Sequence, residues 1–167
     1  MKGLNLDKYD IAISTADMAA RIVVVNVLAS AEPPTDDDET RARAATHSVR
    51  PNPEDYARVF VGEAAAVAHD VYEAAWQSAP SLPLVPPNGR LDVWCRPGIA
   101  FSGEPRLTAK FPGGMRAIAK WLKPDPIWVG WRFVWPDGSD KRSEGLVWLD
   151  GRFAFFPRPW GVLSKLA

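Results

Sequence analysis

The sequence predicts an α+β fold in which N-terminal helices pack on a curved antiparallel sheet. Apolar residues recur at helical spacing in the first part of the chain, whereas from Leu91 the pattern alternates with a period of two. The segment 78–89, SAPSLPLVPPNG, separates the two parts with four prolines and a glycine. A chain of 167 residues with 47% apolar side chains can bury one sizeable core. We therefore expect an N-terminal helical segment over 1–50 and an α+β domain over 51–167, folded together as one compact unit.

The first helix is expected over residues 7–30. Its inner stripe should consist of the apolar residues Ile11, Met18, Ile22, Val25 and Ala29, which recur at spacings of three, four and seven. A polar row on the opposite side consists of Asp10, Ser14, Asp17 and Arg21. The run Ile22–Val25 is β-branched, so a strand over 21–28 is the alternative.

Two later helices have recognisable starts. Thr35 can cap a helix whose first turn holds the acidic run 36–38, because carboxylates are favoured at the positive end of the helix dipole. Asn52 followed by Pro53 predicts a second start. The helix after Asn52 should bury Tyr56, Val59 and Phe60. Gly62 is then expected to break it before a further helix over 63–77.

The second half reads as short strands and one short helix. Strands are expected over 91–95, 106–111, 127–135, 142–149 and 152–157, and a helix over 112–124. The first two strands should form a hairpin around the turn residues of RPGIAFSGEP. The strand 127–135 places Ile127, Val129, Trp131, Phe133 and Trp135 on one face, which predicts that they belong to the core.

The dipeptide Asp150-Gly151 is a strong signal for a type I′ hairpin turn. A two-residue loop at this point pairs Trp148 with Phe153 and fixes the register of the whole hairpin. Both faces of that hairpin are then apolar, so we expect the sheet to be covered on both sides. Helices can cover one side, and the other needs a loop, a second subunit or a cavity that accepts a ligand.

Composition and motif content disfavour several classes of protein. Cys95 is the only cysteine, which excludes an intrachain disulfide and a thiolate zinc cluster. No apolar run approaches the roughly 18 residues of a membrane span, and the N-terminus lacks a signal-peptide pattern. Motifs of P-loop, dinucleotide-binding, α/β-hydrolase and zinc-peptidase proteins are absent. We therefore expect a cytoplasmic protein with no membrane contact, no metal and no cofactor.

The order of these elements resembles that of the NTF2-like superfamily, in which a curved sheet and an N-terminal helix layer form a cone. The resemblance also rests on the aromatic closing strand over 152–160, and it covers residues 53–160. The helical segment before Asn52 is longer than that fold requires. Members of the superfamily include isomerases, hydrolases, dehydratases, immunity proteins of bacterial toxin systems and scaffold domains. The resemblance therefore implies a cone-shaped cavity but no particular chemistry.

One hypothesis is a small NTF2-like enzyme that acts on a hydrophobic metabolite. Its candidate site residues are His69, Asp70, Tyr72 and Asp92, because a histidine or a carboxylate beside a cavity can serve as a general base. Adjacent helical residues point about 100° apart, so His69 and Asp70 are not expected to face each other. The structural alternatives place His69 at the edge of the core, Asp70 in solvent and Asp92 at a strand end.

The function that we favour from sequence is a non-catalytic protein-binding domain of the immunity or accessory type. No pair of titratable groups stands out, and apolar surface exceeds what one helix layer covers. The residues expected to bind are Trp94, Trp128, Trp148, Phe153, Arg116, Lys120 and Lys123. The basic residues would meet an acidic protein surface, whereas a pI of about 6.7 disfavours nucleic acid. The ligand would be an unknown protein or a small hydrophobic molecule, with a homodimer across an uncovered sheet face as a further alternative.

Overall fold

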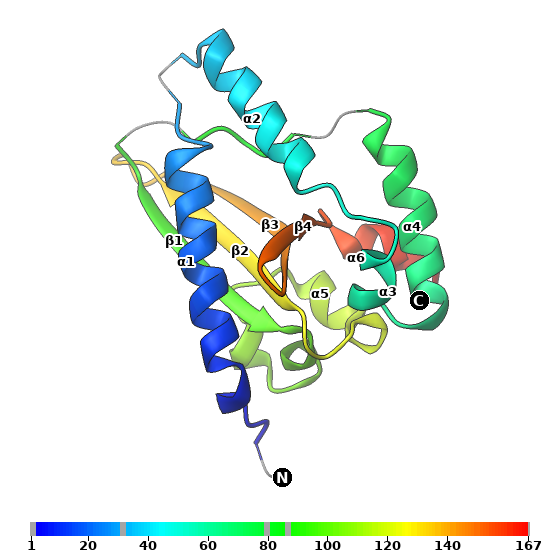
Figure 1. Ribbon diagram of the computed structural model, residues 1–167. Coiled ribbons are helices and arrows are strands. Elements are labelled where there is room, and N and C mark those ends of the chain that lie inside the picture. Colours follow the sequence, from blue (N-terminus) through cyan, green and yellow to red (C-terminus); the bar gives the residue numbers. More distant parts are fainter. Residues whose placement is uncertain (1–2, 31–32, 79–80, 86–87, 167) are drawn as a thin grey trace.

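The computed structural model has an α+β architecture built around one antiparallel sheet (Figure 1). It describes residues 3–30, 33–78, 81–85 and 88–166. The helices are α1 (Asp10–Asn26), α2 (Asp36–Ser48), α3 (Asp55–Val59), α4 (Gly62–Trp76), α5 (Gly113–Ala117) and α6 (Pro159–Val162). The strands are β1 (Arg90–Pro97), β2 (Ile127–Val134), β3 (Asp140–Leu149) and β4 (Arg152–Phe155), and they lie in the sheet in chain order. The predicted α+β class is therefore confirmed.

The β3–β4 hairpin has the register that its turn predicted. The paired residues are Leu149–Arg152, Trp148–Phe153, Val147–Ala154 and Leu146–Phe155. Asp150 and Gly151 both have positive φ angles, 47° and 105°, as a type I′ turn requires. The outer side of β4 has a partner outside the sheet, because the backbone N–H of Phe155 donates to the carbonyl of Val49 at 2.8 Å.

The strand predicted over 106–111 is not formed. The chain leaves β1 through two 3₁₀ turns, Gly98–Ser102 and Pro105–Thr108. Arg96 Nε donates to the carbonyl of Leu107 at 2.7 Å. In a strand, this carbonyl would accept from the backbone N–H of a neighbouring strand. Strand β1 pairs with β2 instead of with its neighbour in the chain.

Both faces of the sheet are covered, as the two apolar faces of the hairpin predicted. Helix α1 packs against β1 and β2. It covers the face of the sheet that carries Cys95, and its Asp17 carboxylate acts electrostatically on that thiol. On the other side, Trp128 packs against Phe60 and Phe156 with ring centroids 6.2 and 6.5 Å apart. Figure 1 shows α1 on one side of the sheet and α4 with α6 on the other.

Helix α1 turns the opposite side toward the sheet from the one predicted. Its buried residues are Ala16, Ala20 and Val24, with Leu28 just beyond its end. Four of the five residues of the predicted inner stripe are exposed to solvent instead: Ile11 by 84%, Met18 by 62%, Ile22 by 54% and Val25 by 55%. The fifth, Ala29, lies beyond the end of the helix and is half-buried. The helix has apolar residues on two opposite sides. The alanine side fits better against the sheet because that face already carries the large side chain of Trp131, paired with Val93.

Helix α2 starts at its predicted capping signal, whereas α3 does not. The Thr35 side chain accepts from the N–H of Asp38 at 3.2 Å, and the Asp38 carboxylate accepts from the N–H of Thr35 at 2.9 Å. Helix α3 begins at Asp55 with Glu54 as its N-cap, so Asn52 and Pro53 lie before the helix and not at its predicted start. The Asp55 carboxylate accepts from the backbone N–H of Asn52 at 2.7 Å. Tyr56, Val59 and Phe60 are buried as predicted. The helix breaks close to the predicted position: α3 ends at Val59, and α4 begins at Gly62, whose φ is 50°.

Strand β2 supplies much of the central core. Ile127, Val129 and Trp131 are buried as predicted, whereas Phe133 and Trp135 at the far end of the strand are only half-buried. Side chains from both halves of the chain belong to this one cluster of buried residues. Within the described residues, no helix has the length and apolar content needed to cross a membrane.

Candidate functional site

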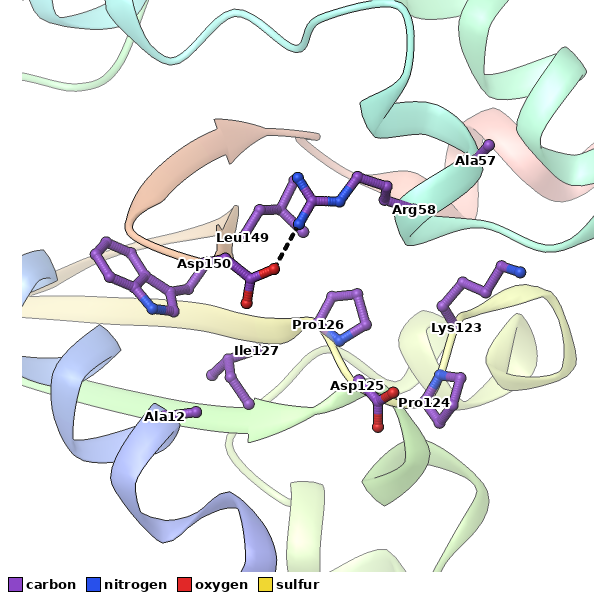
Figure 2. A pocket seen from close by; sticks show the side chains of 11 residues that line it. Ala12, Ala57, Arg58, Lys123, Pro124, Asp125, Pro126, Ile127, Leu149 and Asp150 are labelled. Carbon is purple, nitrogen blue, oxygen red and sulfur yellow. Dashed lines mark hydrogen bonds and ion pairs between the residues drawn. The ribbon is translucent and has the colours of Figure 1, made fainter.

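A cleft of about 330 Å³ opens between the start of α1, helix α3, the segment that enters β2 and the β3–β4 turn (Figure 2). Its apolar lining comes from Ala12, Pro124, Pro126, Ile127 and Trp148, together with Ala57 and Leu149. Its charged lining comes from Arg58, Lys123, Asp125 and Asp150. The cleft therefore combines apolar walls with two charges of each sign.

Three of these four charged groups already have partners. Arg58 Nη2 lies 2.8 Å from the Asp150 carboxylate, and Figure 2 shows this ion pair reaching from α3 to the hairpin turn. Tyr9 donates its hydroxyl to Asp125 at 2.8 Å. Lys123 has no ion pair with any residue in the described part of the chain. Among the described residues that line the cleft, one ammonium group lies beside apolar walls, and no nucleophile lies next to a base.

A buried carboxylate lies behind Arg58, and sequence reasoning did not identify it. Asp55 is fully buried, accepts from the guanidinium of Arg152, and lies 3.9 Å from Arg58. In the sequence, Asp55 simply follows the helix start predicted at Asn52 and Pro53. No local signal could have indicated its contact with Arg152, because that residue is 97 positions away. The arrangement joins α3 to β4 and serves the fold.

His69 and Asp70 do contact each other, so the expectation that they would not is wrong. His69 Nδ1 lies 3.2 Å from the Asp70 carboxylate. The His69 ring also packs edge-on against Tyr56 at 5.0 Å. Both side chains are well exposed, by 45% and 84%, and neither lines the cleft.

The other two enzyme candidates have structural partners of their own. Tyr72 is buried and donates to the carbonyl of Pro157 at 3.0 Å, and burial raises the pKa of its hydroxyl well above the usual value. Asp92 lies 2.7 Å from Arg132 Nη2 and 3.5 Å from Arg90 Nε. The hydrogen bond from Arg132 holds the pKa of the Asp92 carboxyl below its usual value. These groups are engaged in different places and are not assembled around one cavity.

The aromatic residues expected to bind a partner are mostly buried. Trp94, Trp128 and Phe153 are exposed by 8%, 1% and 7%, so they pack in the interior and offer little surface to a partner. Trp148 is only half-buried. It lines the cleft and packs on Phe153 with ring centroids 4.9 Å apart. Of the four aromatic candidates, the structure leaves Trp148 open to a ligand.

The three basic candidates lie in three different environments. Arg116 donates to the carbonyl of Gly103 at 2.9 Å and so holds a loop. Lys120 is exposed and lies over the ring of Trp121, 4.9 Å from its centroid. Lys123 lines the cleft. The set is therefore not one continuous basic surface aimed at one ligand.

The exposed side of α1 is a different kind of surface. Among the described residues, the large apolar side chains that are exposed are Ile11, Met18, Ile22 and Val25, and all four belong to this helix. We call them the outer stripe. Beside them, and not on the opposite side as expected from the sequence, runs a polar row of Asp10, Ser14, Asp17 and Arg21. Within this row Arg21 Nε lies 2.7 Å from the Asp17 carboxylate. The sequence pattern found these residues but assigned them to the interior.

Neither a metal centre nor a known relative accounts for these surfaces. In the parts of the chain that the structure describes, no three histidine, cysteine, aspartate or glutamate side chains come together as a metal site would require. Comparison of the chain with protein-family models, with curated proteins and with solved structures returned no match.

Proposed function

We propose that this chain is a non-catalytic protein-interaction domain and that the outer stripe of α1 is its contact surface. The observation that carries the proposal is the concentration of exposed large apolar side chains on one helix face. Soluble proteins expose single apolar residues freely, but a contiguous group marks an interaction site. A helix presents such a group as a row of anchors at spacings of three and four.

This proposal keeps the binding domain expected from the sequence but places its binding surface elsewhere. An apolar sheet face is no longer the best surface, because α1 packs on one face and the rings of Phe60 and Phe156 pack on Trp128 at the other. The accessory or immunity type of function and a cytoplasmic location agree with a single cysteine, and both remain proposals. The NTF2-like relationship also remains a prediction.

The enzyme hypothesis has less support. General acid–base catalysis needs titratable groups that converge on a substrate-sized cavity. His69 and Asp70 lie in solvent, Tyr72 is tied to Pro157, and Asp92 is paired with arginines. The ammonium of Lys123 makes no ion pair with any described residue, and it suits a ligand that carries a negative charge more than it suits catalysis.

Site-specific photo-crosslinking tests the proposed function. A benzophenone amino acid is placed at Met18 or Ile22 in the full chain, and at Ala66 on the exposed side of α4 as the matched control. Ultraviolet irradiation of cells that make the chain should give a discrete protein adduct at the stripe positions and none at position 66. Equal labelling at all three positions, or no adduct at the stripe, would contradict an interaction surface on α1.

A further inference from the structure

The outer stripe has the spacing of a helix-pairing seam. Together with the exposed Thr15, the four residues of the outer stripe occupy positions 11, 15, 18, 22 and 25. The intervals between these positions are four, three, four and three. That alternation averages 3.5 residues and keeps a seam on one side of a helix that pairs with another helix. The Thr15 hydroxyl donates to the carbonyl of Ile11 at 2.8 Å, so its hydrogen bond is made within the helix.

We propose that the occupant of the outer stripe is the same stripe of a second copy, with the two α1 helices antiparallel. This inference rests on the proposed function and names its partner. A twofold contact of a surface with itself closes after two chains and needs no second surface. Only one such stripe exists among the described residues, so self-pairing removes every exposed large apolar side chain of that region from water.

The fold presents the stripe outward. Residues two positions apart on a helix point about 200° apart, so Ile22 lies on the far side of the helix from its neighbours Ala20 and Val24, which are buried against the sheet. The flank of the stripe on one side holds Ala12 and Ala19, which are small enough to let another helix approach.

Charge selects the antiparallel orientation. In an antiparallel pair related by a twofold axis, the polar row of one α1 runs along the same row of the other in the reverse direction. With position 11 of one copy opposite position 25 of the other, Arg21 lies between Ser14 and Asp17 of the second copy and faces that Asp17 carboxylate. In a parallel pair the same row would face Ala12 and Ala19, which offer no charge. Complementary charges set orientation in such contacts.

The size of the contact sets the expected strength. Helix α1 has 17 residues, so it is about 25 Å long at 1.5 Å per residue. A stable interface buries about 800 Å² on each partner, and one helix face supplies only part of that area. We therefore expect a dimer with a dissociation constant on the order of micromolar.

Sedimentation of the purified full chain measures the association. The wild-type chain should shift from monomer to dimer over a concentration series around the micromolar range. Met18→Lys should weaken dimerisation at least about tenfold, while the control Ala66→Lys should leave it unchanged. Circular dichroism melting shows that both variants fold. A wild-type chain that stays monomeric at several hundred micromolar, or a Met18→Lys chain that dimerises equally well, overturns the inference.

Cysteine pairing tests the orientation. Positions 11 and 25 lie about 21 Å apart along one helix, whereas a disulfide needs Cα atoms within about 7 Å. A mixture of Ile11→Cys and Val25→Cys chains should form the mixed disulfide under mild oxidation, and each variant alone should not. Disulfides that form within each single variant would show parallel pairing and overturn the antiparallel arrangement. The buried Cys95 is common to all chains and is the background in each sample.

The two proposals can fail separately. A monomeric purified chain that still gives a stripe-specific photo-adduct with another protein overturns the second-copy inference and leaves the interaction surface in place. A monomeric chain with no stripe-specific adduct overturns both. An adduct of twice the chain mass that Met18→Lys abolishes supports both.

Discussion

The guanidinium of Arg152 contacts the fully buried carboxylate of Asp55 and thereby ties the closing strand β4 to helix α3. Arg58 approaches the same carboxylate at 3.9 Å and pairs more closely with Asp150 at the hairpin turn. Two arginines therefore lie near the carboxylates of Asp55 and Asp150. Arg152 is the closer partner of Asp55, the carboxylate that water does not reach. The two contacts should differ greatly in their effect on stability.

We expect Arg152→Ala to lower the free energy of unfolding by about 3–5 kcal/mol, because it leaves Asp55 buried without its main partner. Arg58→Ala should have a much smaller effect, since the side chain of Asp150 is 93% exposed and water can replace the ion pair. Urea unfolding monitored by tryptophan fluorescence measures both. Equal losses for the two variants would contradict the assignment of Arg152 as the main partner of Asp55.

Two glycines of the β3–β4 hairpin allow the cost of a left-handed φ to be compared with the cost of a steric clash. Gly145 and Gly151 have nearly the same φ, 106° and 105°, but an added Cβ would lie 2.6 Å from the carbonyl oxygen of Phe156 at Gly145 and would meet nothing within 4 Å at Gly151. We expect Gly151→Ala to cost about 1 kcal/mol from the left-handed φ alone. Gly145→Ala should cost at least about 2 kcal/mol because the backbone must also move. Thermal unfolding measures both, and similar losses would show that the close approach at Gly145 is relieved cheaply.

The single thiol should be inert in the folded chain. Cys95 is buried, and burial raises the pKa of its thiol to about 12. The thiolate is the reactive form, so almost none is present near neutral pH. Reaction with Ellman's reagent at about pH 8 should proceed only as fast as the chain unfolds, and it should become rapid in denaturant. Fast labelling under native conditions would show that Cys95 is accessible.

Acid should weaken the fold partly through Glu73. Hydrogen bonds from Arg50 at 2.7 Å and from Tyr56 at 2.9 Å lower the pKa of this carboxyl from its usual 4.5. A lowered folded-state pKa means that the contribution to stability is present above pH 4.5 and is lost as the pH falls through the folded-state value. Stability should therefore fall less between about pH 6 and about pH 3 in Glu73→Gln than in the wild type.

The matched control for this pH experiment is Glu39→Gln, which changes an exposed glutamate of α2. The control should keep the wild-type pH dependence. Parallel curves for Glu73→Gln and the wild type would mean that the contacts with Arg50 and Tyr56 form equally well with a protonated carboxyl.

Local signals predicted those parts of the fold that are decided locally. The Asp150-Gly151 turn fixes φ at two positions and with it the register of a whole hairpin. The Thr35 cap likewise depends on residues three positions apart. Strand 106–111 was predicted wrongly because its apolar pattern is also compatible with turns. The side chain of Arg96 favours the turns, since it donates to the carbonyl of Leu107.

The candidate surface could be predicted only in part. Helix α1 has two apolar sides about 180° apart, and its sequence favours the one with larger side chains. The side that is buried depends on the bulk of the sheet residues opposite, including Trp131, which lies more than a hundred positions away. The burial of Asp55 depends on Arg152 in the same way. The buried side of α1 and the burial of Asp55 are both determined by tertiary packing, which the spacing of residues within one helix cannot reveal.

The hydrogen bond from Phe155 to Val49 has a consequence for how chains meet at the end of the sheet. Strand β4 has only four residues, and its outer side is partly occupied by a segment of the same chain. A short, capped edge gives an incoming strand few free N–H and C=O groups to pair with, so sheet-to-sheet growth into fibres is discouraged there. The β4 side of the molecule is thereby protected from ribbon-like aggregation even when the protein is concentrated.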